Sequence, residues 1–182
     1  KTELAKILAE VYFKQHQAFV RFDMSEYQTS EAVNRLLGTS ENPGELTEII
    51  KNKPYCLILL DEFEKANPQI LTLFLQILED GRLTGGDSQT VDFTNTIIIA
   101  TSNAGSLTIA HGLSQEKPLD LVENDVRQEL LTLMKPELVN RFDSIVIFKP
   151  LSQFDLEKIV LIKLAAVRQH LIEQEIGRAS CR

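Results

Sequence analysis

The stretch LILLDEFEKANP, residues 57–68, decides the fold that the sequence predicts. Leu57 to Leu60 form an aliphatic run without polar alternation, which is typical of a strand buried on both faces of a parallel sheet. Asp61 and Glu62 follow at its carboxyl end, where open α/β sheets bind their ligands. Taken alone, the two carboxylates could equally be a solvated acidic turn. The rest of the chain has to decide between these interpretations.

Composition and charge restrict the class of protein. With 182 residues, 43% of them hydrophobic and 25% charged, the chain can form one globular domain, or one domain with part of a second. The net charge of −7 argues against a broad surface for nucleic acid or for an anionic membrane. No apolar run approaches the ~20 residues of a membrane span, and no signal-peptide pattern is present. The expectation is a cytoplasmic protein without nucleic-acid or membrane partners.

Hydrophobic spacing predicts strands that alternate with helices. Strands are expected at 18–24, 56–60, 95–103 and 144–151, and a hairpin at 80–93. Helices are expected at 3–15, 29–38, 45–52, 68–79, 122–134 and 152–175, whereas 104–121 is expected to be irregular. Such alternation predicts an α/β fold with a mainly parallel sheet.

Polar residues at the expected strand and helix ends suggest nucleotide chemistry. Lys1 and Thr2 precede an amphipathic helix, as do the last two residues of a phosphate loop, although two residues alone are a weak signal. Asp61 would hold Mg²⁺, partly through water, and Glu62 would deprotonate the attacking water. Asn103, at the end of the next buried strand, could position the same water or could simply cap a turn.

Six segments spread over residues 1–175 are together more specific than any one of these motifs. They are KTELAK, RFDMSEY, GELTEIIKNKPYCLILLDEFEKANP, LQILEDGRLT, TVDFTNTIIIATSNAGS and PELVNRFDSIVIFKPL. In this order and spacing, they resemble the second ATPase module of the Clp-type AAA+ unfoldases and disaggregases.

The resemblance implies an architecture. Residues 1–151 would be the large α/β subdomain of an AAA+ P-loop NTPase, a parallel sheet flanked by helices that lacks its central first strand and most of the phosphate loop. Residues 152–175 would be the first helix of the small helical subdomain. The segment 176–182 departs abruptly from the helical pattern before it and is expected to be a non-native tail. The isolated piece is expected to be inactive.

The resemblance also implies roles for single residues. The nucleotide would be bound by Lys1, Thr2 and Asp61, with Thr2 and Asp61 on the magnesium ion. Catalysis would fall to Glu62, to Asn103 as sensor 1, and to Arg141 as the arginine finger that reaches a neighbouring subunit's nucleotide. Alternatively, Arg141 is a surface residue that pairs with Glu137 or Asp143.

Members of the family form hexameric rings of identical subunits, hydrolyse ATP with Mg²⁺ and pull protein substrates through a central pore, some with a peptidase partner. One departure concerns substrate contact, because residues 39–43, TSENP, replace a longer loop that carries an aromatic residue. The hairpin at 80–93 could contact substrate instead, or the protein could remodel partners without threading them. The departure could also be a deletion in a working ring.

Two other classes of function stay open at this point. One is a non-hydrolysing AAA-like interaction scaffold, and the other is an AAA+ ATPase that acts on nucleic acid. The acidic composition argues against the second. The three histidines, His16, His111 and His170, show no metal-ligand spacing, and Cys56 within the aliphatic strand is expected in the core.

Overall fold

The computed structural model describes residues 1–14 and 18–173. The expected tail at 176–182, and His16, lie outside the described residues. The chain divides into two units, Lys1–Ile147, which holds the sheet, and Phe148–Arg182, which holds one long helix. Among the described residues, no helix combines the length and the apolar content needed to cross a bilayer.

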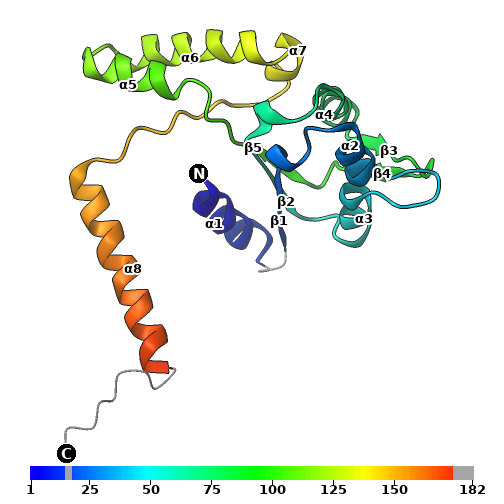
Figure 1. The fold of residues 1–182 in the computed structure, drawn as a ribbon, viewed down its shortest axis with the longest axis horizontal. Coiled ribbons are helices and arrows are strands. Elements are labelled where there is room, and N and C mark those ends of the chain that lie inside the picture. The colour runs from blue at the N-terminus through cyan, green and yellow to red at the C-terminus, as the bar shows by residue number, and fades with distance from the viewer. Residues whose placement is uncertain (15–17, 174–182) are drawn as a thin grey trace, which may run out of the picture. The chain divides into compact units, whose positions relative to one another are not determined.

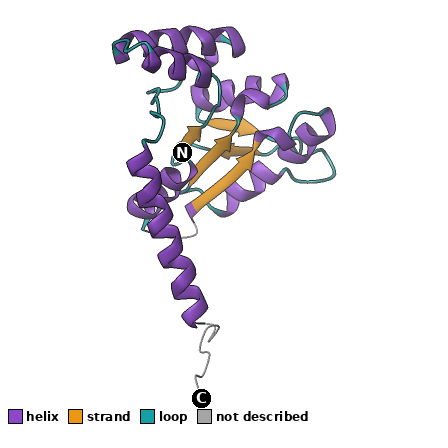
Figure 2. Ribbon diagram, turned by 60° about the vertical axis from the view of Figure 1, so that its left-hand side comes forward, coloured by secondary structure: helices purple, strands orange, loops and turns teal. Residues whose placement is uncertain are grey.

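Three parallel strands form the sheet, in the order β1-β2-β5 (Figures 1 and 2). They are β1 (Phe19–Asp23), β2 (Leu57–Asp61) and β5 (Ile97–Ala100). The register places Asp23 beside Asp61, and Leu60 beside Ala100, so the three strands end at one edge of the sheet. The predicted parallel α/β fold is therefore confirmed.

Most remaining elements also agree with the predicted pattern. The helices of the first unit are α1 (Thr2–Phe13), α2 (Ser30–Leu37), α3 (Glu45–Asn52), α4 (Pro68–Asp80), α5 (Ser106–Ser114), α6 (Leu119–Leu133) and α7 (Pro136–Val139). Short 3-10 turns are η2 (Met24–Glu26) and η3 (Phe63–Lys65), and a hairpin pairs β3 (Arg82–Thr84) with β4 (Thr90–Asp92). Thr29 caps α2, accepting the Ala32 N–H at 3.3 Å, and Asn67 caps α4, accepting the Gln69 N–H at 3.0 Å.

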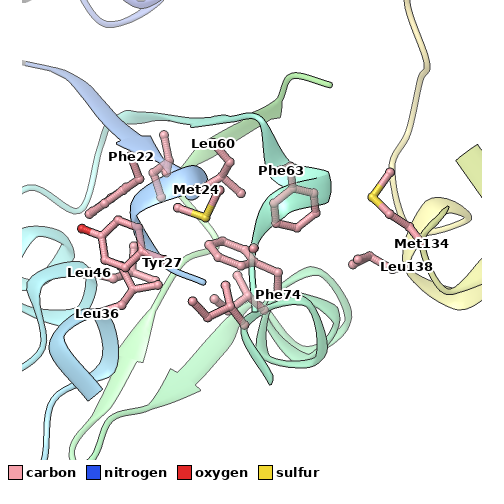
Figure 3. Packing of buried hydrophobic residues seen from close by; sticks show 14 of the residues in the cluster. Phe22, Met24, Tyr27, Leu36, Leu46, Leu60, Phe63, Phe74, Met134 and Leu138 are labelled. Carbon is pink, nitrogen blue, oxygen red and sulfur yellow. The ribbon is translucent and has the colours of Figure 1, made fainter. Parts of the chain in front are cut away.

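Both faces of β2 are covered, which explains its unbroken aliphatic sequence. Ile58 and Leu60 belong to the larger core, shown in Figure 3, where Phe63 and Phe74 meet edge to face with their centroids 5.5 Å apart. Leu57 and Leu59 point to the opposite face and pack under Ala5 and Ala9 of α1. Cys56 is fully buried, so its expected place in the core is confirmed.

The prediction of irregular structure at 104–121 is wrong. Helix α5 occupies much of this segment, and it packs against α6 as a helical pair (Figure 1). Gly112 resembles a helix breaker in the sequence, but a Cβ atom there would lie 2.6 Å from the Val122 side chain. The glycine therefore permits the two helices to approach closely.

The predicted strand at 144–151 is also wrong, since these residues adopt no regular structure. Ile145 and Val146 are 36% and 70% exposed. A strand needs a partner for its backbone groups, and in the described chain β5 is hydrogen-bonded only to β2. The apolar signal is present, but the pairing that would turn it into a strand is not.

The second unit contains α8 (Gln153–Glu173). Six apolar residues at helical spacing are each at least 39% exposed: Leu156, Ile159, Val160, Leu164, Val167 and Leu171. Ser152 begins the helix by a reciprocal contact with Asp155, whose carboxylate accepts the Ser152 N–H at 3.1 Å. This places the helix start where the sequence predicts it.

Tyr27 gives the fold a predicted pH dependence. Burial, helped by the hydrogen bond to Glu45, raises the pKa of the Tyr27 hydroxyl to about 12. An unfolded tyrosine ionises near pH 10, so between pH 10 and 12 the unfolded chain holds fewer protons and the free energy of unfolding falls as pH rises. We expect a loss of roughly 2 to 3 kcal/mol across this window, and a shallower loss in Tyr27→Phe. Denaturant titrations of this domain at several alkaline pH values test this, and equal slopes in both proteins would contradict it.

Candidate functional site

Polar residues from three elements meet at the carboxyl edge of the sheet. Asp61 ends β2, and Glu62 starts the turn η3 that follows it. Thr101 and Asn103 follow β5, and Thr101 is tied to β2 because its N–H donates to the Leu60 carbonyl at 2.8 Å. Lys1, at the start of α1, reaches the same place through its hydrogen bond to Asn103. The parallel register is what brings Asp61 together with the residues that follow β5.

Asp61 is held by two neighbours. The Thr101 hydroxyl donates to one of its carboxylate oxygens, and Arg21 donates to the other through Nη2 at 2.7 Å and Nε at 3.1 Å. Asp61 keeps 17% of its side chain exposed. Arg21 and Thr101 thus orient the carboxylate, which stays partly accessible to solvent. The sequence alone assigns no role to Arg21, although a parallel register, with Arg21 opposite Leu59, puts it on the face that carries Asp61.

Asn103 links Glu62 to Lys1. Its Nδ2 donates to Glu62 Oε1 at 3.2 Å, and its Oδ1 accepts from Lys1 Nζ at 3.2 Å. Lys1 Nζ also donates to the Ser102 carbonyl at 2.5 Å. The Asn103 side chain therefore does not cap the following turn, a task that Ser102 performs by accepting the Ala104 N–H at 3.0 Å.

The backbone at Glu62 is unusual for a residue with a side chain. Glu62 has φ 54 and ψ 47, in the left-handed region. Such conformations cost about 1 kcal/mol or more and gather at functional sites. The Phe63 N–H holds the turn by donating to the Thr101 carbonyl at 2.9 Å. Lys65 Nζ lies 2.5 Å from Glu62 Oε2, and this hydrogen bond raises the pKa of Lys65.

Two of the predicted site residues do not join this cluster. Thr2 lies next to Lys1 at the start of α1, but no hydrogen bond joins it to Asp61 among the described residues. Arg141 forms an ion pair with Glu79 in the last turn of α4, and the described structure shows no ion pair between Arg141 and Glu137 or Asp143. In the part of the chain that the structure describes, it makes no ion pair with Asp61 or Glu62.

The polar groups gathered at this site fit a magnesium nucleotide. An ammonium group at the start of a helix, here Lys1 before α1, suits phosphate oxygens. Mg²⁺ prefers oxygen ligands and is usually held by one or two carboxylates together with phosphates and water. Asp61 could supply a carboxylate, and the Thr2 hydroxyl, next to Lys1 in the chain, is a second oxygen of the required kind. Glu62 lies beside Asp61 with one oxygen on the Asn103 amide. The chemistry of this set suits hydrolysis of a phosphoanhydride.

The short loop at 39–43 is closed on itself. The Thr39 N–H donates to the Asn42 carbonyl at 2.7 Å, and an isolated bridge joins Gly38 to Pro43. The loop also lies against the hairpin tip, since the Gly86 N–H donates to the Leu37 carbonyl at 3.2 Å and a Cβ atom on Gly86 would lie 2.3 Å from the Gly38 carbonyl oxygen. It is therefore a compact turn without an aromatic side chain.

Comparison with known proteins places this chain in a family. Residues 1–145 match the family model for the AAA domain (Cdc48 subfamily). The chaperone protein ClpB of Aquifex aeolicus is 45% identical over 97% of this chain and 19% of that protein. ClpB of Clostridium perfringens is 46% identical over 97% of this chain and 21% of its own length. The chloroplastic ClpB3 of Arabidopsis thaliana is 40% identical over 97% of this chain and 19% of its own length.

A solved structure agrees with these relatives. The closed-state cryoEM reconstruction of Hsp104 with ATPγS and FITC casein matches with a TM-score of 0.82 and 41% identity, covering 93% of this chain and 30% of that one. The chain spans about one fifth of the length of the curated relatives. The resemblance to Clp-type AAA+ proteins is thereby confirmed, and the chain belongs to the AAA domain family, Cdc48 subfamily.

Proposed function

We propose that this chain is an ATPase module of a ring-forming AAA+ protein that couples Mg²⁺-dependent ATP hydrolysis to the unfolding or remodelling of polypeptides in the cytoplasm. The observation that carries the proposal is the Asn103 amide, which joins Lys1 to Glu62 beside Asp61. The family implies nucleotide binding. Relatives named as chaperones, and an Hsp104 reconstruction with ATPγS and casein, support a nucleotide and a protein substrate. The hexameric ring of identical subunits is part of the proposal.

Each residue of the cluster has a proposed task. Lys1 places its positive charge beside the β- and γ-phosphates. Thr2 and Asp61 provide oxygen ligands for Mg²⁺, directly or through water. When bound, Mg²⁺ neutralises charge on the phosphates. Glu62 accepts the proton of the attacking water, while its contacts with Asn103 and Lys65 hold the carboxylate in place. Asn103 orients the same water toward the terminal phosphate.

The proposed module boundaries are 1–151 for the large α/β subdomain and 152–175 for the first helix of the small one. The change of unit at Phe148 and the start of α8 at Gln153 support them.

We further propose that the sheet is completed by a central strand beside β5. The four residues of β5 are only partly buried, whereas Leu57–Leu60 of β2 are fully buried, and Ile145 and Val146 are exposed apolar residues without a partner strand.

The decisive experiment is ATP turnover by the full-length protein and by its Glu62→Gln variant. Loss of a general base typically costs at least about 100-fold in rate, so we expect turnover to fall by this much while ATP binding is retained. Glu123→Gln, an exposed carboxylate on α6, is the control and should keep full turnover. If the assembled wild-type protein binds ATP but does not hydrolyse it, the chain is a non-hydrolysing scaffold instead.

A further inference from the structure

The loop that carries Asn103 is fixed by carboxylates from outside it. The Asn103 N–H donates to Glu64 Oε1 at 3.1 Å, and the Gly105 N–H donates to Glu129 Oε1 at 3.0 Å. Glu64 belongs to the turn η3 after Glu62, whereas Glu129 belongs to α6. Because Asn103 and Gly105 lie between β5 and α5, where no helix or sheet ladder fixes the backbone, these side chains take over that task.

Glu64 makes this contact at a cost to stability. Its second oxygen, Oε2, is buried and has no hydrogen-bond partner among the described residues. A buried polar atom left without a partner typically costs about 1 to 3 kcal/mol, and more when it is charged. Groups that oppose stability in this way concentrate at functional sites. The carboxylate also accepts a charge-assisted hydrogen bond from the Asn103 N–H, and such a bond is stronger than a hydrogen bond between neutral groups.

We propose that Glu64 is a positioning residue of this site, and that its carboxylate fixes the Asn103 backbone so that the amide side chain meets both Glu62 and Lys1. The inference rests on the proposed function. Asn103 Nδ2 and Oδ1 each lie 3.2 Å from their partners, Glu62 Oε1 and Lys1 Nζ, so a small rotation of the backbone breaks both contacts. A misplacement of about 1 Å at a reacting group can cost on the order of 100-fold in rate.

The test compares Glu64→Ala and Glu64→Gln in the full-length assembled protein. Alanine removes the acceptor, and we expect kcat for ATP hydrolysis to fall about 10- to 100-fold while the KM for ATP stays within about threefold. Glutamine keeps an acceptor oxygen and should restore kcat to within about threefold of wild type. Thr29→Ala removes a comparable contact to a backbone N–H at the start of α2, far along the chain from this site, and should leave turnover unchanged.

Two further measurements separate positioning from general stability. Hydrogen exchange of the Asn103 backbone N–H should be faster in Glu64→Ala than in wild type and in Glu64→Gln, even without nucleotide. In an Asn103→Ala background, Glu64→Ala should lower kcat by less than about twofold, because its effect passes through the side chain already removed. Two results overturn the inference. One is a wild-type kcat in Glu64→Ala, and the other is a double variant whose fall in kcat equals the product of the falls in the Glu64→Ala and Asn103→Ala single variants. If wild type itself fails to hydrolyse ATP, the proposed function fails, and the exchange measurement still decides whether Glu64 holds the loop.

Discussion

Replacing Arg141 with alanine is expected to lower ATP turnover of the assembled protein roughly 1,000-fold, the lower end of what an arginine supplied to a phosphoryl-transfer site contributes. The geometry motivates a role in a neighbouring subunit. The Arg141 side chain is 51% exposed and pairs with Glu79 on α4, and in the described residues it has no ion pair with its own Asp61 or Glu62. A half-exposed pair is weak, so Arg141 can exchange Glu79 for a phosphate on another subunit. Steady-state turnover, with nucleotide affinity measured separately, checks this prediction.

Mixed rings distinguish a contribution between subunits from one within a subunit. Arg141→Ala and Glu62→Gln subunits should each be inactive alone. In a mixed ring, an intact Glu62 of one subunit can face an intact Arg141 of its neighbour, so part of the turnover should return. Arg127→Ala, on α6, and Glu79→Gln are controls that should retain turnover. Absence of any recovery in mixed rings, with both variants still assembling, would show that Arg141 does not act between subunits.

Much of the fold could be predicted because its signals are local. The aliphatic run of β2 has no polar face, and the structure buries both of its faces. Thr29 and Pro68 mark helix starts by side-chain chemistry that depends on few neighbours. These features follow from residues within one turn or strand, and a single sequence contains them.

The errors arose where the outcome depends on distant partners. Residues 144–151 carry the same apolar signal as β5, but a strand forms only beside another strand, and the apolar pattern carries no information on pairing. Gly112 marks a close approach to Val122, a residue of the next helix, which a helix-breaking rule cannot anticipate. Local composition is ambiguous at both places, and tertiary contact decides.

The site divides in the same way. Glu62 and Asn103 could be predicted as neighbours because parallel strands end at one edge of a sheet, whereas Lys1 is predicted from its resemblance to the end of a phosphate loop. The structure brings the three together. Arg21 and Glu64 were missed because their importance depends on register and on the fold of the turn after β2. The catalytic and nucleotide-binding roles of the predicted residues stay predictions that the variants above test.

The packing around the turn η3 leads to a second large effect, on stability. Phe74 is 1% exposed and meets Phe63, the residue after Glu62, edge to face, while Phe63 also meets Phe142 with centroids 6.3 Å apart (Figure 3 shows Phe63 and Phe74). The aromatic contacts therefore join the turn after β2 to α4 and to the residue that follows Arg141. Removing a buried member of such a cluster, such as Phe74, leaves a cavity that the neighbours fill only in part.

Phe74→Ala is expected to lower the free energy of unfolding by about 3 to 5 kcal/mol. Because domains of this size are typically stable by only about 5 to 15 kcal/mol, much of the variant should be unfolded or aggregated at 37 °C. Leu107→Ala on α5, where the leucine is 87% exposed, is the matched control and should change stability by less than about 0.5 kcal/mol. Denaturant unfolding of this domain measures both. A Phe74→Ala variant as stable as Leu107→Ala would mean that the turn carrying Glu62 does not rest on this aromatic cluster, and the geometry of the site would then need another support.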